Sequence, residues 1–359
     1  MADERQIDFV LVFALQKELL AFLRHVGEYT TEHKGVTFHR AELRLSDQQC
    51  YHLIAIALPE MGNYAAATVT TRAIDVWNPR FILLGGIAGG AKRPGVQLGD
   101  VVVADVIVGY EPGKQRPEKL ERRLKFLRAA DVLVDAAKNL EPREWALGAS
   151  VSRPDGKSDR VIPRVHFGTV VSGEKVIASA DWMRELSKDI QSARSSDAGQ
   201  IAAVEMEAYG TALAAYRAPT APGMLMAKAI CDWADANKND GWQEYAADVS
   251  ATFLVALLKS RPVPVSMARE QAIRVDAKPY SGRSKIGLCG RMDDNWEDLA
   301  DYYDIPLADR KLFRPGRECQ DIWKWLENRK KLGGLPEALK RIGREDLIDE
   351  LLPQEPGEA

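Results

Sequence analysis

Six short apolar runs, separated by segments with helical periodicity, occupy the first two-thirds of this 359-residue chain. The runs cover residues 7–15, 51–58, 80–86, 101–108, 167–172 and 223–230, and helical spacing follows at 17–26, 65–77, 205–216 and 245–258. Runs that are apolar at every position must be buried on both faces, which a parallel sheet covered by helices provides. The sequence therefore predicts an α/β domain with a mixed, mostly parallel sheet flanked by helices.

This pattern ends at RPVP, residues 261–264, because its two prolines cannot continue a helix. Residues 265–285 are polar and lack periodicity, and beyond about residue 286 only helical spacing remains. Four stripes at that spacing are Trp296, Leu299, Ala300 and Tyr303; Ile322, Trp325, Leu326 and Arg329; Leu335, Leu339 and Ile342; and residues 346–352. We expect a first domain over 1–262, a linker over 263–285 and a small all-α bundle over 286–359.

Charge and composition exclude several classes of protein. Lys+Arg 49 against Asp+Glu 52 gives a net charge of -3, which excludes binding to nucleic acid through overall charge. No apolar run approaches the ~18–20 residues of a membrane span, and residues 1–8 are polar, so no membrane segment or secretion signal is expected. The four cysteines lack CxxC spacing, so we expect no disulfide framework, no metal site and a cytoplasmic location.

Polar residues follow the ends of the apolar runs, where parallel sheets bind ligands. Glu18 follows the first run, GGIAGG at 85–90 follows the third, and Asp232 follows the sixth. Glu205 and Glu207 open the helical segment between the last two runs. Carboxylates beside glycines suit an acid/base site, although the same residues also fit a plain tight turn and helix caps. GxGxxG and GxxxxGK[ST] are absent, and no cofactor is expected.

Five ordered motifs add a family resemblance to this pattern. They are FALQKELLAF (13–22), GGIAGG with LGDVVVAD (85–105), VVSGEKVI (170–177), AVEMEA (203–208) and KAICDWAD (228–235). From about residue 7 to 260 the chain resembles the nucleoside phosphorylase superfamily, and most of all its hydrolytic branch, the methylthioadenosine/S-adenosylhomocysteine nucleosidases. Residues 232–247 further resemble phosphorylase-like domains that are fused to defence and signalling modules.

The resemblance implies a role for each matching residue. Glu18 would activate the attacking water, Glu207 would hold the ribose hydroxyls, and Asp232 would protonate the imidazole nitrogen of the purine. The substrate would also meet Ala88, Gly89, Val176, Ile177, Glu205, Met206, Lys228 and Cys231, with Met206 against the sugar and Ile177 at the base. Cleavage of an N-glycosidic bond builds positive charge on the ribose and negative charge on the base, so an acid and a water-activating carboxylate are both needed.

The chain departs from the nucleosidases at four positions, which leaves the particular substrate open. Cys231 replaces a serine, Lys228 an arginine, Val176 the aromatic residue that stacks on adenine, and Ile87 the serine of the glycine turn. Phosphorolysis would need basic residues around a phosphate, and GGIAGG contains none. Glu18, which matches the water-activating residue of the family, also favours hydrolysis. Four basic residues near strand ends fit either a grip on nucleotide phosphates or a solvated loop: Lys92, Arg93, Lys114 and Arg116.

The tail resembles another family, the death-like effector-associated domains of bacterial conflict systems, over about residues 290–352. The matching segments are NWEDLADYYDI, DIWKWLENR and LPEALKRIGREDLIDELL. Basic residues gather at 324–331 and acidic ones at 293–304. Opposed charges suit homotypic docking, although any solvated bundle surface also shows them.

Together these features predict a purine nucleoside or nucleotide N-glycosidase, with an adenine nucleotide such as ATP among its substrates. It would be an effector in bacterial antiphage defence, a homo-oligomer, and recruited or regulated through its death-like domain. The alternatives are a phosphate-dependent purine nucleoside phosphorylase, a salvage enzyme and a nucleotide sensor without turnover.

Overall fold

The computed structural model divides the chain into two compact units, residues 1–266 and 267–359, here called the N-terminal and C-terminal units. It describes residues 6–47, 49–117, 120–157, 161–193, 200–237, 239–265, 280, 282–292, 296–329 and 331–351. Most of the expected linker, 263–285, lies outside these residues, and its last part is helical because helix α9 begins at Gly282. In the described part of the chain, no helix is long and apolar enough to cross a membrane.

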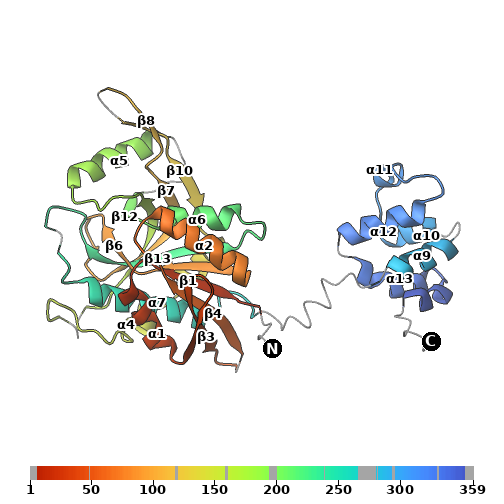
Figure 1. The fold of residues 1–359 in the computed structure, drawn as a ribbon, viewed down its shortest axis with the longest axis horizontal. Helices are drawn as coiled ribbons and strands as arrows, with labels where there is room; N and C mark the ends of the chain where they lie inside the picture. Colours follow the sequence, from red (N-terminus) through yellow and green to blue (C-terminus); the bar gives the residue numbers. More distant parts are fainter. Residues whose placement is uncertain are drawn as a thin grey trace. The chain divides into compact units, whose positions relative to one another are not determined.

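The N-terminal unit is built on an eleven-stranded sheet whose centre is parallel (Figure 1). β1 (Phe9–Phe13) lies between β4 (Cys50–Ala57) and β5 (Phe81–Gly85) and runs parallel to both. β13 (Gly223–Asp232) continues the sheet beside β5. Farther along, β13 pairs with β6 (Ile87–Gly90) and with β7 (Val101–Gly109).

Five strands close on themselves at the far side of the sheet. β11 (Val165–Ser172) pairs in parallel with β7 and with β12 (Ile201–Glu205), and β12 pairs antiparallel with β6. Because β6 and β7 also pair with β13, the ring β7–β11–β12–β6–β13 is closed. This closure brings the ends of β12 and β13, which carry carboxylates, close to β6.

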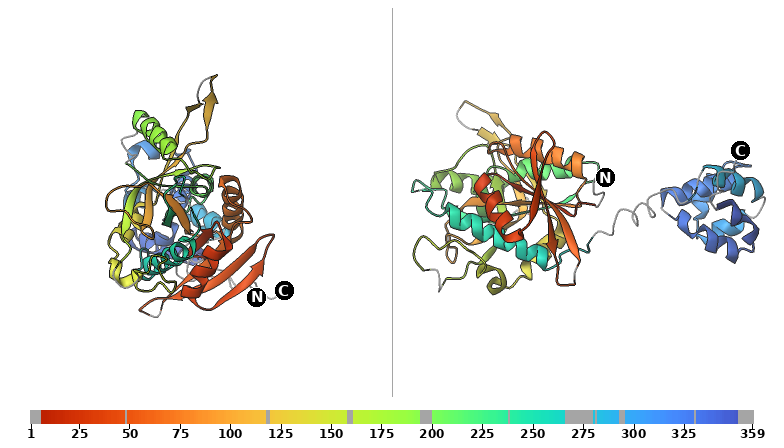
Figure 2. Two further views of the ribbon diagram at one scale, coloured as in Figure 1. Left: turned by 90° about the vertical axis from the view of Figure 1, so that its left-hand side faces the viewer. Right: turned by 60° about the horizontal axis from the view of Figure 1, so that its bottom comes forward.

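Helices cover both faces of the sheet. α1 (Gln16–Val26) packs against α7 (Gln243–Lys259) on one face, and α2 (Asn63–Trp77) packs against α6 (Ala208–Arg217) on the other (Figure 2). Alternate side chains of β1 point to opposite faces of the sheet. Phe9, Leu11 and Phe13 belong to the core under α1 and α7. Val10 and Val12 belong to the core under α2 and α6. This double burial is what the apolar runs predict, and the mixed, mostly parallel fold is confirmed.

Two parts of the sheet differ from the expectation. The hairpin β2 (Tyr29–His33) and β3 (Thr37–Arg44) extends the sheet beyond β4, and its polar outer strand gave no apolar run. The GGIAGG segment was expected as a turn, but residues 87–90 form β6. Gly86, whose φ is +121°, separates β5 from β6, and both strands run parallel to β13.

Smaller elements complete the N-terminal unit. They are β8 (Gly113–Gln115), β9 (Leu120–Arg122), β10 (Lys125–Arg128), α3 (Asp131–Lys138), α4 (Pro142–Ala146) and α5 (Ala180–Ser192). β8 and β9 form a separate two-stranded hairpin. An ion pair of 2.6 Å between Arg122 and Asp189 ties this hairpin to α5.

The C-terminal unit is a helical bundle with its own core. Its elements are α9 (Gly282–Arg291), α10 (Trp296–Tyr302), α11 (Leu307–Arg310), α12 (Glu318–Asn328), η2 (Leu332–Gly334), α13 (Leu335–Arg341), η3 (Glu345–Leu347) and η4 (Asp349–Leu351). Leu299, Ile322, Leu326 and Leu339 are buried at its centre, as their spacing predicts.

Two details of the bundle differ from the expectation. Trp323 occupies the core position expected for Trp325, and the indole N–H of Trp325 instead donates to Asp309 at 2.8 Å. The last stripe, 346–352, was expected as one helical segment, and its described residues form two short 3-10 helices, η3 and η4. These short helices bury Leu347 and Leu351.

Candidate active site

One pocket of the N-terminal unit brings together nearly all of the residues singled out from the sequence. Its lining includes Glu18, Ala88, Gly89, Val176, Ile177, Glu205, Met206, Glu207, Cys231 and Asp232. The remaining residue, Lys228, is buried on β13 and binds two of the lining carboxylates. The pocket therefore lies where the sequence predicts it, at the ends of the apolar strands. Residues of α1, β6, β12 and β13 all line it.

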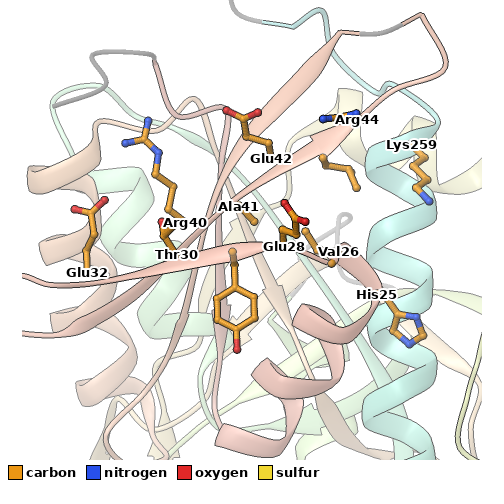
Figure 3. A pocket seen from close by; sticks show the side chains of 13 residues that line it. His25, Val26, Glu28, Thr30, Glu32, Arg40, Ala41, Glu42, Arg44 and Lys259 are labelled. Carbon is orange, nitrogen blue, oxygen red and sulfur yellow. The ribbon is translucent and has the colours of Figure 1, made fainter. Parts of the chain in front are cut away.

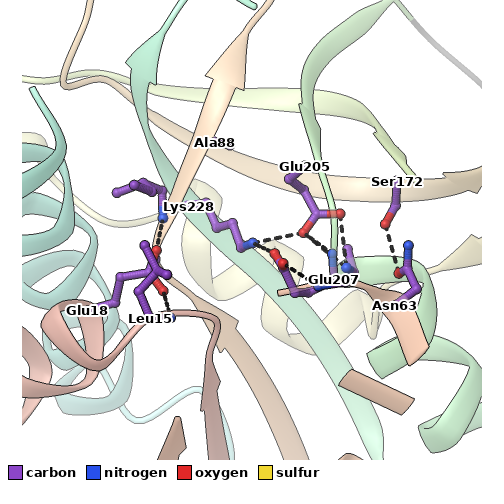
Figure 4. A network of polar contacts seen from close by, with 12 residues as sticks. Leu15, Glu18, Asn63, Ala88, Ser172, Glu205, Glu207 and Lys228 are labelled. Atoms are coloured by element: carbon purple, nitrogen blue, oxygen red, sulfur yellow. Dashed lines mark hydrogen bonds and ion pairs between the residues drawn. The ribbon is translucent and has the colours of Figure 1, made fainter. Parts of the chain in front are cut away.

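Glu18 is a buried carboxylic acid in the first turn of α1, 1% exposed. Its Oε2 accepts the backbone N–H of Leu15 at 2.9 Å, and its Oε1 accepts that of Ile87 at 3.0 Å (Figure 4). Burial raises the pKa of Glu18 to about 7, although the positive charge of Lys228 opposes the shift. Near neutral pH this side chain is therefore able to gain or lose a proton.

Gly86 permits this position of Glu18. A Cβ atom at residue 86 would lie 2.5 Å from the carboxyl carbon of Glu18, and the backbone there has a positive φ. Only glycine meets both conditions without strain. Gly86 therefore has a structural reason that is specific to the pocket.

Lys228 joins the two carboxylates of the AVEMEA motif. Its Nζ lies 2.8 Å from Glu205 Oε2 and 2.7 Å from Glu207 Oε2, and all three side chains are buried. Burial alone would lower the pKa of Lys228, but the facing carboxylates outweigh it and raise that pKa. The ammonium therefore stays charged and compensates the buried negative charge.

Glu205 and Glu207 have different surroundings, although they are two residues apart. Glu205 is the last residue of β12 rather than the start of a helix, and it accepts the backbone N–H groups of Glu207 and Ala208 at 2.9–3.0 Å. Burial would raise the pKa of Glu205, but Lys228 and these hydrogen bonds hold it below its ordinary value. Glu207 occupies the N-cap position of α6, and its side chain accepts the N–H of Gly62 at 3.1 Å. Glu205 thus anchors the start of α6, and Glu207 borders the pocket.

Asp232 ends β13 on the same pocket. Its Oδ1 accepts the N–H of Ala234 at 2.8 Å, and the thiol of Cys231 lies 3.5 Å from Oδ2. A Cβ atom at Gly89 would lie 3.0 Å from Oδ1, so the glycine of β6 keeps space beside the carboxyl group. The Cys231 thiol also reaches the carbonyl oxygen of Ala88 at 3.6 Å, which ties β13 to β6 at this point.

Several residues of the site were missed from the sequence. Asn63 Oδ1 accepts the Ser172 hydroxyl at 3.0 Å and the Gly210 N–H at 2.7 Å, and its Nδ2 donates to the Gly173 carbonyl at 3.1 Å. This network fixes the end of β11 against α2 and α6. Met61 and Gln243 also line the pocket. Met61 and Asn63 follow β4, so the strand-end rule would have found them, whereas Gln243 carries no sequence signal.

The four basic residues considered as phosphate ligands do not line this pocket. Lys92 and the β8 residue Lys114 are exposed, and Arg116 forms an ion pair of 3.0 Å with Glu121. Among the described residues that do line the pocket, the one cation is Lys175. Its ammonium binds Glu111 at 2.8 Å. The solvated interpretation fits Lys92, Lys114 and Arg116, and Arg93 is half-buried outside the pocket lining.

A larger groove of about 1230 Å³ lies elsewhere, between the β2–β3 hairpin and the ends of α1 and α7 (Figure 3). Acidic Glu28 and Glu42 and basic Arg44 and Lys259 border it, and all four are exposed. Exposed charges of both signs are ordinary surface features. The buried, hydrogen-bonded carboxylates lie in the smaller pocket, which we take as the candidate active site. Among the described residues, no group of three His, Cys, Asp or Glu is placed to hold a metal ion.

Comparison with known families agrees with this geometry. Residues 8–259 match the model of the phosphorylase superfamily, and residues 282–354 match that of bacterial Death-like domain 3. The chain belongs to the phosphorylase superfamily. Both resemblances found in the sequence are thereby confirmed.

Curated relatives are similar over the N-terminal unit. A death domain-containing ATP nucleosidase of Amphimedon queenslandica is 27% identical, over 55% of this chain and 37% of its own length. The ATP nucleosidase Cap17 of Escherichia coli is 26% identical, over 62% of this chain and 44% of its own. A 5'-methylthioadenosine/S-adenosylhomocysteine nucleosidase of Mycobacterium bovis is 26% identical, over 61% of this chain and 84% of its own length. The chain thus spans less than half the length of the first two.

Solved structures share the fold. The 5'-methylthioadenosine/S-adenosylhomocysteine nucleosidase of Neisseria meningitidis aligns with a TM-score of 0.55 and 19% identity, over 70% of this chain and 99% of that one. Futalosine hydrolase of Helicobacter pylori aligns with a TM-score of 0.53 and 19% identity, over 70% of this chain and 97% of that one. At this identity the likeness establishes the fold alone.

Proposed function

We propose that the N-terminal unit hydrolyses the N-glycosidic bond of a purine nucleoside or nucleotide. The observation that carries the proposal is the convergence of Glu18, Glu207 and Asp232 on one pocket from three different elements. Release of a purine needs a base for water, a partner for the sugar and an acid for the leaving base. The three carboxyl groups match these three tasks.

Glu18 is the base in this proposal. A carboxylate with a pKa of about 7 is deprotonated in about half of the molecules at neutral pH and holds a proton more strongly than an ordinary glutamate. Two backbone N–H groups fix its direction, and each oxygen keeps a further lone pair for water. Its carboxylate draws a proton from the water as the water attacks the anomeric carbon.

Glu207 holds the ribose hydroxyls. Its two oxygens are already oriented by Lys228 and by the Gly62 N–H, and each retains a lone pair that accepts a hydroxyl hydrogen. Hydroxyl contacts of this kind strengthen as the sugar becomes cationic and contribute several kcal/mol in other glycosidases. Lys228 and Glu205 act behind it as positioning residues.

Asp232 is the acid that protonates the leaving purine. The Ala234 N–H and the Cys231 thiol orient its carboxyl group, and Gly89 leaves room beside it. Protonation of the base removes the negative charge that bond cleavage would otherwise leave on it. Val176, which is 53% exposed, and Ile177 border the pocket and would meet the flat face of the base.

Hydrolysis is favoured over phosphorolysis by the charge of the lining. Lys228 is already bound to two carboxylates and Lys175 to Glu111, so neither is poised to hold a phosphate beside Glu18. Two similar proteins carry the name ATP nucleosidase. We therefore propose a purine nucleotide as substrate, with ATP as the first candidate.

The test is release of free base from a panel of purine nucleosides and nucleotides, with and without inorganic phosphate. We expect base from at least one substrate at a rate that phosphate does not change. Dependence on phosphate would replace the proposal with a phosphorylase. Binding of a nucleotide without any release of base would replace it with a sensor.

We also propose that the C-terminal unit recruits or regulates this activity in bacterial antiphage defence, within a homo-oligomer. Its match to bacterial Death-like domain 3 supports this role. Plaque counts on bacteria that carry the wild type, Asp232→Asn or Lys324→Glu test it. Lys324 is exposed on α12, so Lys324→Glu changes only the surface of the bundle. We expect both variants to lose protection and only Asp232→Asn to lose base release; equal protection by Asp232→Asn would contradict the role.

A further inference from the structure

Two cysteine thiols from different helices meet inside the C-terminal unit. Cys289 lies in the last turns of α9, and Cys319 is the second residue of α12. The two thiols are close enough to interact, and both side chains pack in the same apolar core, where α9 and α12 are in contact. They are 30 positions apart in the sequence and have no CxxC spacing, so only the fold reveals the pair.

The two thiols are not equivalent. Cys289 is half-buried, whereas Cys319 is 7% exposed. The neighbouring Cys319 thiol lowers the pKa of the Cys289 thiol, and the positive charge of Lys285, one turn earlier on α9, acts in the same direction. The interaction between the two thiols raises the pKa of Cys319. Cys289 is therefore the accessible nucleophile, and Cys319 is the protonated partner beside it.

We propose that Cys289 and Cys319 are a redox modification site at which a peroxide-class oxidant forms a reversible disulfide between α9 and α12. The Cys289 thiolate attacks the peroxide, takes one oxygen as a sulfenic acid and releases hydroxide, or water after protonation. The Cys319 sulfur then attacks the Cys289 sulfur and displaces the second water. Two thiols and one hydrogen peroxide thus give one disulfide and two water molecules.

The remaining cysteines provide an internal comparison. Cys50 begins β4 in the N-terminal unit. Cys231 is buried in the candidate active site, where its thiol contacts the Asp232 carboxyl group and the Ala88 carbonyl oxygen. Both of these partner atoms of Cys231 are oxygens, so neither of the two contacts supplies the second sulfur of a disulfide.

A disulfide at this place closes the segment that contains α10 and α11. Such a cross-link restricts the unfolded chain and also holds α9 against α12 in the folded state. Thiols are kept reduced in a cytosolic environment, so the cross-link would form only under oxidising conditions and would be reversed by a thiol reductant. The C-terminal unit would then exist in a reduced state and in a more rigid oxidised state.

Peptide mapping of the full-length protein tests the proposal. The protein is treated with hydrogen peroxide, its remaining thiols are alkylated, and it is digested with trypsin without reduction. The sequence places Cys289 in the tryptic peptide IGLCGR (286–291) and Cys319 in ECQDIWK (318–324). We expect the two peptides to appear joined, with the mass of their sum less two hydrogens, and to separate on reduction.

Two variants distinguish the steps. In Cys319→Ser we expect a sulfenic acid at Cys289 that a dimedone-type reagent captures, and in Cys289→Ser we expect Cys319 to remain alkylatable. Thermal unfolding of the wild type provides a second readout, in which oxidation raises the midpoint of the C-terminal unit by about 5 °C or more. Separate IGLCGR and ECQDIWK peptides at a peroxide dose that oxidises Cys50 would overturn the proposal. Oxidation of Cys289 to a sulfinic acid without the joined peptide would do the same.

Discussion

Lys228 in the N-terminal unit and Arg291 in the C-terminal unit each bind two carboxylates, but only Lys228 is buried. Its side chain is 1% exposed and bridges Glu205 and Glu207. The side chain of Arg291 is 52% exposed and bridges Asp346 and Glu350. Among the described residues of the C-terminal unit, the one buried polar residue is Ser284.

The contrast shows where each unit places its charged side chains, in the interior or at the surface. Removing ions from water is costly unless partners compensate them, so a fold retains buried charges where they have a task. Among the described residues, four buried carboxylates of the N-terminal unit line one pocket: Glu18, Glu205, Glu207 and Asp232. Three others are buried elsewhere, where Asp8 meets Arg80, Asp100 meets His166 and Asp248 meets His25. The Arg291 ion pairs of the C-terminal unit lie at its surface. Surface charges contribute little to stability, but they orient a protein toward its partners.

The largest effect is expected when the proposed general acid is replaced by an amide. Asp232→Asn is isosteric and keeps an oxygen for the Ala234 N–H, so the fold should be unchanged. We expect base release to fall by about 10²–10⁴-fold, the usual contribution of a general acid. Chromatographic detection of free purine measures the loss, and Asp346→Asn on the C-terminal unit is the matched control. Full turnover by Asp232→Asn would refute the mechanism.

The second prediction concerns stability and compares replacement of Lys228 with replacement of Arg291. Lys228→Met leaves two buried carboxylates without their cation, and we expect the free energy of unfolding to fall by about 3–5 kcal/mol. Arg291→Met removes an exposed pair and should change it by about 1 kcal/mol or less. Hydrogen exchange of the full-length protein in denaturant resolves the two units. An equal decrease in the free energy of unfolding for both variants would contradict the difference between the buried and the exposed cation.

The pH dependence of activity should follow Glu18. Burial raises the pKa of this carboxyl to about 7, and the deprotonated form is the base. Activity should therefore rise with pH until it levels off about one pH unit above 7, and it should be about 50-fold lower at pH 5 than at pH 7, because few molecules retain the carboxylate at pH 5. The pH profile of kcat/KM measures this. A flat profile over that range would mean that Glu18 is not the base. By contrast, Arg344 lowers the pKa of the exposed Asp346, so that surface carboxylate stays charged throughout.

The smallest effect concerns glycine. Gly86→Ala places a methyl group 2.5 Å from the Glu18 carboxyl carbon at a positive φ, so we expect a loss of about 1–3 kcal/mol in stability together with lower activity. Gly290→Ala in α9 meets nothing within 4 Å and should stabilise the C-terminal unit by up to about 1 kcal/mol. Melting curves and base release measure both variants. Unchanged activity in Gly86→Ala would show that Glu18 needs no space from this residue.

Sequence reasoning succeeded where burial alone dictates structure. β1 is apolar at every position because helices cover both of its faces, and Glu18 and Asp232 follow from the rule that ligands meet strand ends. It missed β6, because four residues that include two glycines carry no strand signal, and it missed the polar edge strand β2. Lys228 was placed by resemblance, but its bridge between two glutamates depends on strand pairing. Trp323 and Trp325 show a similar limit, since two adjacent aromatic residues leave the helix face ambiguous.

The most direct test of the central claim is the origin of the oxygen on the released sugar. The wild-type protein is incubated with ATP and phosphate in water enriched in ¹⁸O, and the sugar product is analysed by mass spectrometry. Water activated by Glu18 would place one heavy oxygen on the anomeric carbon, so the account predicts free adenine and a sugar phosphate that carries the label there. A sugar 1-phosphate formed from the added phosphate, or intact ATP after prolonged incubation, would contradict it.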